Sequence, residues 1–199
     1  MKNDANNDAN KEPKLEPMIM SVPEAGKMLN LGISSSYGAY LGGFPERARV
    51  LIGAGRDDAV LHICGGMARR YPYKGGFGVK DKTLDSNPAC DPDYLQDVFE
   101  PWPRQPLTGG DWRYIICDPP YSPEDAENYP AGPSAYPRPN KIITHAFKHL
   151  EVGGKVGILH YMLPRCPKDG KFVAVVGVLC GFNNRIRCFS VFEKLNKET

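Results

Sequence analysis

Short apolar runs, each ended by glycine or aspartate, recur along the chain from residue 59 onward and limit its fold more than any other feature. Two of them are residues 59–64, which Gly65-Gly66 follow, and residues 114–117, which Asp118 follows. Residues 78–84, which stop at Asp85, are a further short strand candidate. Nearly uninterrupted apolar sequence is typical of strands that are buried on both faces. These runs therefore predict strands of a parallel sheet.

Three further strands and one helix complete the predicted fold. Strands are expected at 155–163, 172–180 and 186–195, and the link between the last two is short enough for an antiparallel hairpin. A helix is expected over 141–150, where apolar residues recur at helical spacing, with Gly153-Gly154 ending it. The sequence thus predicts an α/β fold with a Rossmann-like, mostly parallel sheet and a C-terminal antiparallel hairpin.

The length of 199 residues is typical of one domain with tails. Residues 1–17 carry almost no apolar side chains, so we expect a disordered leader there and a single domain over 18–199, with a short helix after Ser21. No apolar run is long enough to span a bilayer, and Met1–Asn10 lacks the apolar core of a signal peptide. We therefore expect a cytoplasmic protein that does not bind membranes.

Charge and cysteine content narrow the classes of partner and site. The net charge of +2 is too small for a protein that wraps nucleic acid with its whole surface, so such contact would need a local patch. The six cysteines include no Cys-x-x-Cys pair, and free thiols without a metal are expected. His145 and His149 have a metal-compatible spacing but no third ligand nearby, which favours an exposed helix face.

The segment Asp118-Pro119-Pro120-Tyr121 resembles the motif of class I S-adenosylmethionine-dependent amino-methyltransferases, which methylate exocyclic amines of nucleic-acid bases. The resemblance implies that the Asp118 carboxylate and the Pro119 carbonyl accept the two hydrogens of the target amine, which favours a tetrahedral nitrogen. Pro119 and Pro120 stiffen the loop and remove competing backbone donors. Tyr121 would offer a flat face to an extruded base.

The resemblance extends to the residues expected around S-adenosyl-L-methionine. His62, Cys64, Gly65 and Gly66 fall where the family places an acidic residue, an aromatic residue and glycines around the methionine moiety. Gly66 matches a family glycine, whereas His62 replaces the acid and Cys64 replaces the aromatic residue.

Two aspartates follow in the order of the family. Asp85, 19 residues after Gly66, is expected to accept the ribose hydroxyls of the cofactor. Asp97, 12 residues further on, is expected to accept the adenine amine, and Asp118 follows after another 21 residues.

Several functional alternatives stay open at this point. Methylation of adenine N6 in DNA comes first, ahead of cytosine N4. An RNA methyltransferase acting on guanine N2 or adenine N6 is a second hypothesis, and a catalytically weak binding subunit with this fold is a third. The chain has no room for a sizeable target-recognition region, so a partner or a homodimer would supply specificity, or the target would be recognised by its shape, as structured RNA is.

Three further segments are candidates for contact with a substrate or cofactor. His160 and Tyr161, at the end of a predicted strand, are candidates for a role beside the substrate. The loop 122–140, with Tyr129, Tyr136 and Arg138, is a candidate for base stacking or for a lid, and residues 37–44 are a candidate cover of the cofactor.

Overall fold

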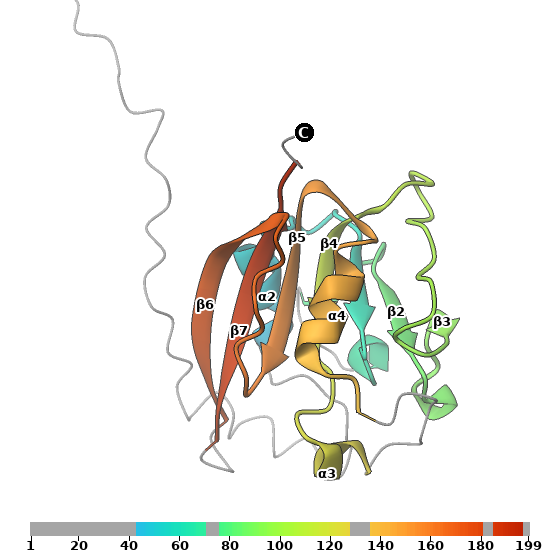
Figure 1. Ribbon diagram of the computed structural model, residues 1–199. Helices are drawn as coiled ribbons and strands as arrows, with labels where there is room; N and C mark the ends of the chain where they lie inside the picture. Colours follow the sequence, from blue (N-terminus) through green and yellow to red (C-terminus); the bar gives the residue numbers. More distant parts are fainter. Residues whose placement is uncertain (1–42, 71–75, 128–135, 181–184, 197–199) are drawn as a thin grey trace, which may run out of the picture.

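The computed structural model describes residues 43–70, 76–127, 136–180 and 185–196, and these residues form one seven-stranded sheet with helices on both faces (Figure 1). Its elements, in chain order, are α2 (Phe44–Ile52), β1 (Val60–Ile63), η1 (Ala68–Arg70), β2 (Lys82–Asp85), η2 (Pro88–Cys90), β3 (Tyr94–Leu95), β4 (Trp112–Cys117), α3 (Pro123–Ala126), α4 (Pro139–Ala146), β5 (Leu150–His160), β6 (Gly170–Cys180) and β7 (Arg185–Lys194). Within these ranges, every helix is too short or too polar to cross a bilayer.

The strand order is β3-β2-β1-β4-β5-β7-β6. β1 runs parallel to β2 and β4, and β3 and β5 extend the parallel arrangement on either side. β7 is antiparallel to both β5 and β6. The predicted α/β sheet with an antiparallel C-terminal hairpin is therefore confirmed, while the turn at 181–184 lies outside the described residues.

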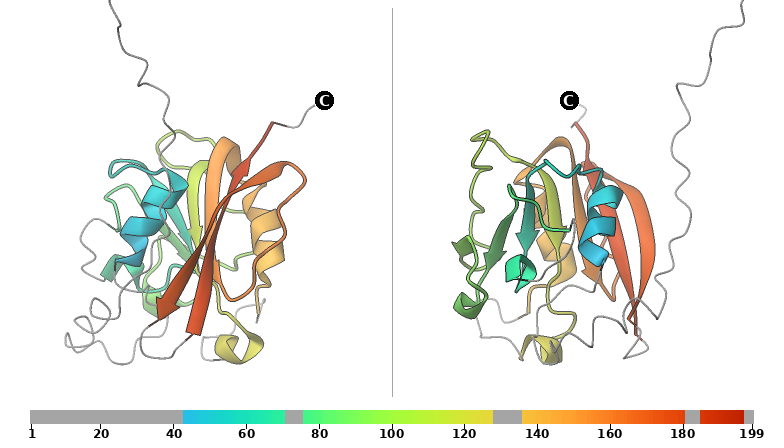
Figure 2. Two further views of the ribbon diagram at one scale, coloured as in Figure 1. Left: turned by 90° about the vertical axis from the view of Figure 1, so that its left-hand side faces the viewer. Right: turned by 180° about the vertical axis from the view of Figure 1, so that it is seen from behind.

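The central strands of the sheet are buried on both faces because α2 covers one face and α4 covers the other (Figure 2). Along β1, Val60 packs with Phe44 and Ile52 of α2, whereas Leu61 and Ile63 pack with the apolar residues of α4. All four β1 residues are buried. This double coverage explains why the strands are apolar without alternation.

The helix predicted over 141–150 is shorter in the structure. α4 ends at Ala146, and Leu150 is already the first residue of β5, paired with Trp112 of β4. Leu150 is fully buried in the same core cluster as Ile142 and Ile143, so the apolar pattern continues across the turn into the strand. Gly153 thus lies within β5, at φ +76°, and does not end the helix.

The boundaries of two strands also differ from the prediction. β2 begins at Lys82, because Gly78 to Asp81 form a turn in which the Asp81 N–H donates to the Gly78 carbonyl at 3.1 Å. β5 ends at His160 and leaves Met162 and Leu163 exposed.

Several predictions concern residues beyond those described. The leader 1–17, the helix after Ser21, residues 37–42 and Tyr129 all lie outside the described residues. The division into a leader and a single domain over 18–199 therefore stays a prediction.

Candidate active site

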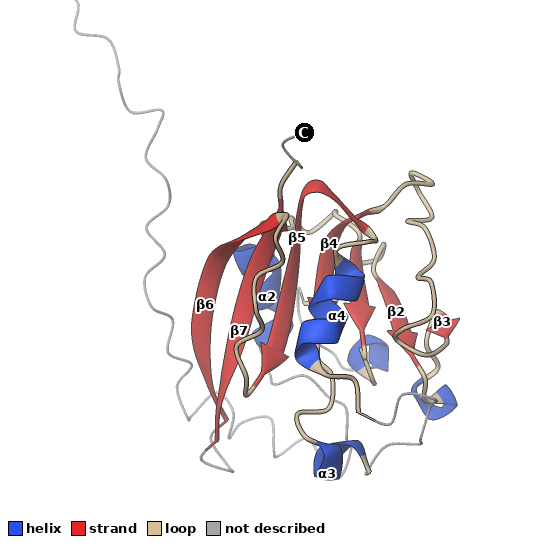
Figure 3. Cartoon of the chain, viewed as in Figure 1, coloured by secondary structure: helices blue, strands red, loops and turns tan. Residues whose placement is uncertain are grey.

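The carboxyl ends of β1, β2 and β4 meet at one edge of the sheet, where the connections are mostly loops (Figure 3). Backbone hydrogen bonds continue past the strand ends: the Cys64 N–H donates to the Leu84 carbonyl at 2.9 Å, and the Asp118 N–H donates to the Ile63 carbonyl at 3.1 Å. The structure therefore brings residues 64–66, the glycine bend, beside Asp85 and beside residues 118–121, the acidic proline loop.

The glycine bend has a backbone that side chains rarely permit. Cys64 has φ +52° and Gly66 has φ +50°, both in the left-handed region. A Cβ atom on Gly65 would lie only 3.1 Å from the His62 Cβ and 3.3 Å from the Thr83 Cγ2. The bend is thus shaped by close packing between β1 and β2, with its backbone turned toward the site edge.

Asp85 is tied directly to the glycine bend. Its Oδ2 accepts the Gly66 N–H at 2.9 Å, and its Oδ1 accepts the Asn87 N–H at 2.9 Å. Burial raises the pKa of the Asp85 carboxyl, and these backbone donors oppose the shift. A carboxylate in this position is oriented by the backbone of two neighbouring segments.

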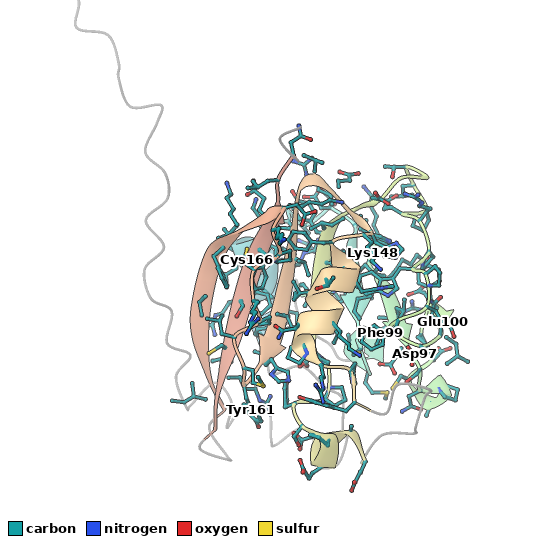
Figure 4. The ribbon with its side chains drawn as sticks, viewed as in Figure 1. Asp97, Phe99, Glu100, Lys148, Tyr161 and Cys166 are labelled. Carbon is teal, nitrogen blue, oxygen red and sulfur yellow. The ribbon has the colours of Figure 1, made fainter. Side chains whose placement is uncertain are left out.

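Asp97 follows β3 and is largely buried, with its Oδ1 accepting the Phe99 N–H at 2.8 Å. Figure 4 shows it on the β3 side of the sheet. Burial raises the pKa of the Cys64 thiol well above its usual range, and the charges of Asp85, Asp118 and Asp97 add to the effect. The charges of all three predicted site carboxylates therefore contribute to the raised pKa of the Cys64 thiol.

The acidic proline loop is held by its own tyrosine. The Tyr121 hydroxyl donates to the Asp118 Oδ1 at 2.5 Å. Burial raises the pKa of Asp118 to about 6, while this hydrogen bond and the charge of Arg187 act in the opposite direction. Directly afterwards, the Ser122 Oγ accepts the Asp125 N–H at 3.0 Å and caps α3, which fixes the exit of the loop.

Tyr121 is surrounded by aromatic and cationic groups from other elements. Its ring centroid lies 4.9 Å from that of Tyr161 and 5.8 Å from that of His160. The guanidinium carbon of Arg187, from β7, lies 4.3 Å from the same centroid. Tyr136 donates its hydroxyl to the Tyr121 carbonyl at 3.2 Å. Figure 4 shows Tyr161 at the end of the sheet near α3.

His160 is fully buried and neutral at physiological pH. Its Nδ1 accepts the Met162 N–H at 2.9 Å, so the proton of the neutral ring is on Nε2. Burial lowers the pKa of His160 to about 4, although a backbone interaction with Pro120 opposes the shift. His160 therefore packs against the acidic proline loop as an uncharged ring.

His62 does not join the other predicted cofactor residues. Its ring is completely buried, with Nε2 3.1 Å from the Asp81 Oδ2 and with its centroid 5.1 Å from that of the tilted Phe77 ring. The Arg49 Nη1 of α2 donates to the same Asp81 oxygen at 2.7 Å. Burial opposes ionisation of Asp81, but the bonds from His62 and Gly78 and the Arg49 charge lower its pKa overall.

Sequence analysis did not identify two residues of this region, Arg187 and Asp81. Arg187 could have been found from the hairpin, because a strand antiparallel to β5 starts at the carboxyl edge of the sheet. Asp81 had no pattern that could have indicated it. His145 and His149, by contrast, pack against the Trp102 ring, at 5.1 and 5.3 Å between centroids.

Comparison with solved structures identifies the fold. TrmN from Thermus thermophilus superposes with a TM-score of 0.52 at 14% sequence identity, over 87% of this chain and 52% of TrmN. The chain has the class I methyltransferase fold. A Streptococcus thermophilus protein provisionally named a hemolysin has a TM-score of 0.50 at 10% identity, over 82% of this chain and 70% of that one. An rRNA methylase from Streptococcus thermophilus has a TM-score of 0.46 at 12% identity, over 77% and 95%.

These likenesses concern the fold, because the sequence identities are low. The chain spans about half the length of TrmN. No protein-family model matches the chain, and a search among curated proteins finds no match either. The activity must therefore be argued from the site itself.

Proposed function

We propose that the chain is an S-adenosylmethionine-dependent methyltransferase that acts on an exocyclic amine of a nucleic-acid base, with adenine N6 of DNA as the first candidate. The observation that carries this proposal is the position of Asp118. Its carboxylate is fixed by the Tyr121 hydroxyl at the same sheet edge as the glycine bend and Asp85. In sheets of this kind, ligands bind beyond the carboxyl ends of the strands.

The donor set at this edge suits S-adenosylmethionine. In the proposed complex the Asp85 carboxylate accepts the ribose hydroxyls, and the Asp97 carboxylate accepts the adenine amine. The backbone of Cys64 to Gly66 is proposed to lie under the methionine part, and Gly66 adopts the left-handed conformation that glycine permits there. The cofactor supplies a methyl group on a positively charged sulfur, and carboxylates nearby complement that charge.

The chemistry of an aryl amine explains why an acceptor is needed. The nitrogen lone pair is delocalised into the ring and is a poor nucleophile. The Asp118 Oδ2 and the Pro119 carbonyl would each accept one amine hydrogen and favour a tetrahedral nitrogen with a localised lone pair. Because the pKa of Asp118 is about 6, the carboxylate is mostly ionised at pH 7 and can accept these hydrogens.

The proton balance also fits Asp118. A bound cofactor would supply the methyl group, and the methylated amine nitrogen would be cationic and strongly acidic. The Asp118 carboxylate would take the surplus proton and pass it to solvent. His160 is not suited to this task, because its Nδ1 already accepts the Met162 N–H.

Transfer of a labelled methyl group tests the proposed function. The purified chain is incubated with labelled S-adenosylmethionine and either unmethylated DNA or total RNA, and the nucleosides are identified after digestion. We expect labelled N6-methyladenine in the DNA. Label in RNA alone would move the substrate to RNA. No label in either nucleic acid, with no cofactor binding, would contradict the proposal and favour a binding subunit.

Asp85→Ala is expected to weaken cofactor binding. The lost pair of charge-assisted hydrogen bonds costs about 1.5–3 kcal/mol in all, so affinity for S-adenosylhomocysteine should fall by about 10- to 150-fold in isothermal titration calorimetry. Asp57→Ala, which removes an exposed carboxylate before β1, serves as the matched control and should leave affinity unchanged. Equal affinities for the two variants would show that the ribose lies elsewhere.

A further inference from the structure

Arg187 reaches the proposed site because of how β7 joins the sheet. β7 pairs antiparallel with β5, and Cys188 lies opposite His160, the last residue of β5. Arg187, one residue earlier in β7, is therefore placed at the carboxyl edge of the parallel strands. This is the edge that holds the acidic proline loop.

The guanidinium of Arg187 lies against two tyrosine rings. Its central carbon is 4.3 Å from the centroid of Tyr121 and 5.9 Å from that of Tyr161. The two rings are 4.9 Å apart and tilted by 45°. A planar cation at this distance is attracted to the electron-rich face of the ring and restricts its rotation. One face of Tyr121 is thereby covered from β7.

Arg187 also acts on Asp118 through its charge. The Asp118 carboxylate interacts with three other groups. It accepts a hydrogen bond from the Tyr121 hydroxyl of its own loop, and its charge acts on the Cys117 thiol at the end of β4 and on the Cys64 thiol of the glycine bend. Burial raises the pKa of both thiols, so they are uncharged at neutral pH. Arg187 contributes a positive charge from β7, which lowers the pKa of Asp118 against the effect of burial.

We propose, on the basis of the function proposed above, that Arg187 is a positioning residue of the active site: it restricts the orientation of the Tyr121 ring on which the target base is proposed to stack, and its charge stabilises the Asp118 carboxylate. The two effects can be separated, because lysine keeps the charge but lacks the flat guanidinium. Glutamine lacks the charge altogether.

The charge effect is measured without any assay of activity. The Asp118 carboxyl is titrated by carbon-13 nuclear magnetic resonance, with its signal assigned by its loss in Asp118→Asn. We expect a midpoint near pH 6 in the wild type and a rise of about 0.5 to 1 in Arg187→Gln. Arg187→Lys should stay within a few tenths of the wild type. An unchanged midpoint in Arg187→Gln would overturn the electrostatic role.

Arg113→Gln is the matched control for this titration. Arg113 is an exposed arginine of β4 whose guanidinium carbon lies 5.8 Å from the Tyr114 ring. Its replacement removes one positive charge and one cation–aromatic contact outside the proposed site, as Arg187→Gln does within it. The titration midpoint of Asp118 should not move in this variant. An equal rise in both variants would show that the shift reflects only the change in net charge of the protein.

The stacking role is measured in the active protein. Arg187→Lys should raise KM for DNA several-fold while keeping the acid limb of kcat near pH 6, and Arg187→Gln should shift that limb upward as well. An unchanged KM in Arg187→Lys would overturn the stacking role. This test uses the lysine variant alone, so it holds even if Arg187→Gln does not fold. If the wild type transfers no methyl group, the proposed function fails, while the titration still decides whether Arg187 acts on Asp118.

Discussion

Replacing Asp118 with alanine is expected to reduce methyl transfer by about 10²–10³-fold or more, which is the usual loss when a preorganised partner of the transition state is removed. The alanine variant cannot hold the amine hydrogens or receive the surplus proton. Cofactor affinity should stay within about threefold, because Asp85 and Asp97 are retained. Single-turnover transfer and titration with S-adenosylhomocysteine measure the two quantities separately.

Two further variants sharpen this test. Asp118→Asn keeps an oxygen that can accept one amine hydrogen, so it should retain part of the activity that the alanine variant loses. Glu124→Ala removes an exposed carboxylate six residues further along and should transfer at the wild-type rate. A fully active Asp118→Ala variant would contradict the role assigned to this carboxylate.

Of the substitutions proposed here, Asp81→Ala is expected to lower the free energy of unfolding most. The Asp81 carboxylate is fully buried and accepts from Arg49, from His62 and from the Val60 and Gly78 N–H groups. Its removal leaves the buried Arg49 charge without its carboxylate, which typically costs about 3–5 kcal/mol. Urea denaturation should show a loss of this size. Because His62 immediately precedes Ile63 and the glycine bend, the variant should also bind the cofactor more weakly.

A surface ion pair provides the control for Asp81. Asp111 forms a salt bridge with Arg104, whose side chain is 66% exposed, so Asp111→Ala should cost at most about 1 kcal/mol. The pH dependence follows from the lowered pKa of Asp81: its contribution is present above pH 3.8, the ordinary value for aspartate, and is lost as the pH falls through the folded-state pKa. Equal losses for the two alanine variants would contradict the buried network.

The central strands of this chain could be predicted from its sequence because they are covered on both faces. β1, β4, β6 and β7 lie within two residues of their predicted positions. The residues at the strand ends also indicated the site edge, since Gly65-Gly66 and Asp118 come after β1 and β4, and Asp85 is the last residue of β2. The end of α4 could not be predicted, because Leu150 continues the apolar pattern into β5.

The orientation of several side chains could not be predicted from the sequence. Tyr121 was expected only as a stacking surface, yet its hydroxyl also binds Asp118. His62 was expected beside the cofactor, but its ring points into the core toward Asp81. The contacts of His62 with Asp81 and of Arg187 with Tyr121 join residues far apart in the chain, and no local spacing encodes them.

A crystal structure with S-adenosylhomocysteine tests the central claim most directly. The account predicts the ribose hydroxyls on the Asp85 carboxylate, the adenine amine at Asp97, and the sulfur facing Asp118 and Tyr121. A ligand bound away from the glycine bend, or with its sulfur turned away from Asp118, would contradict it.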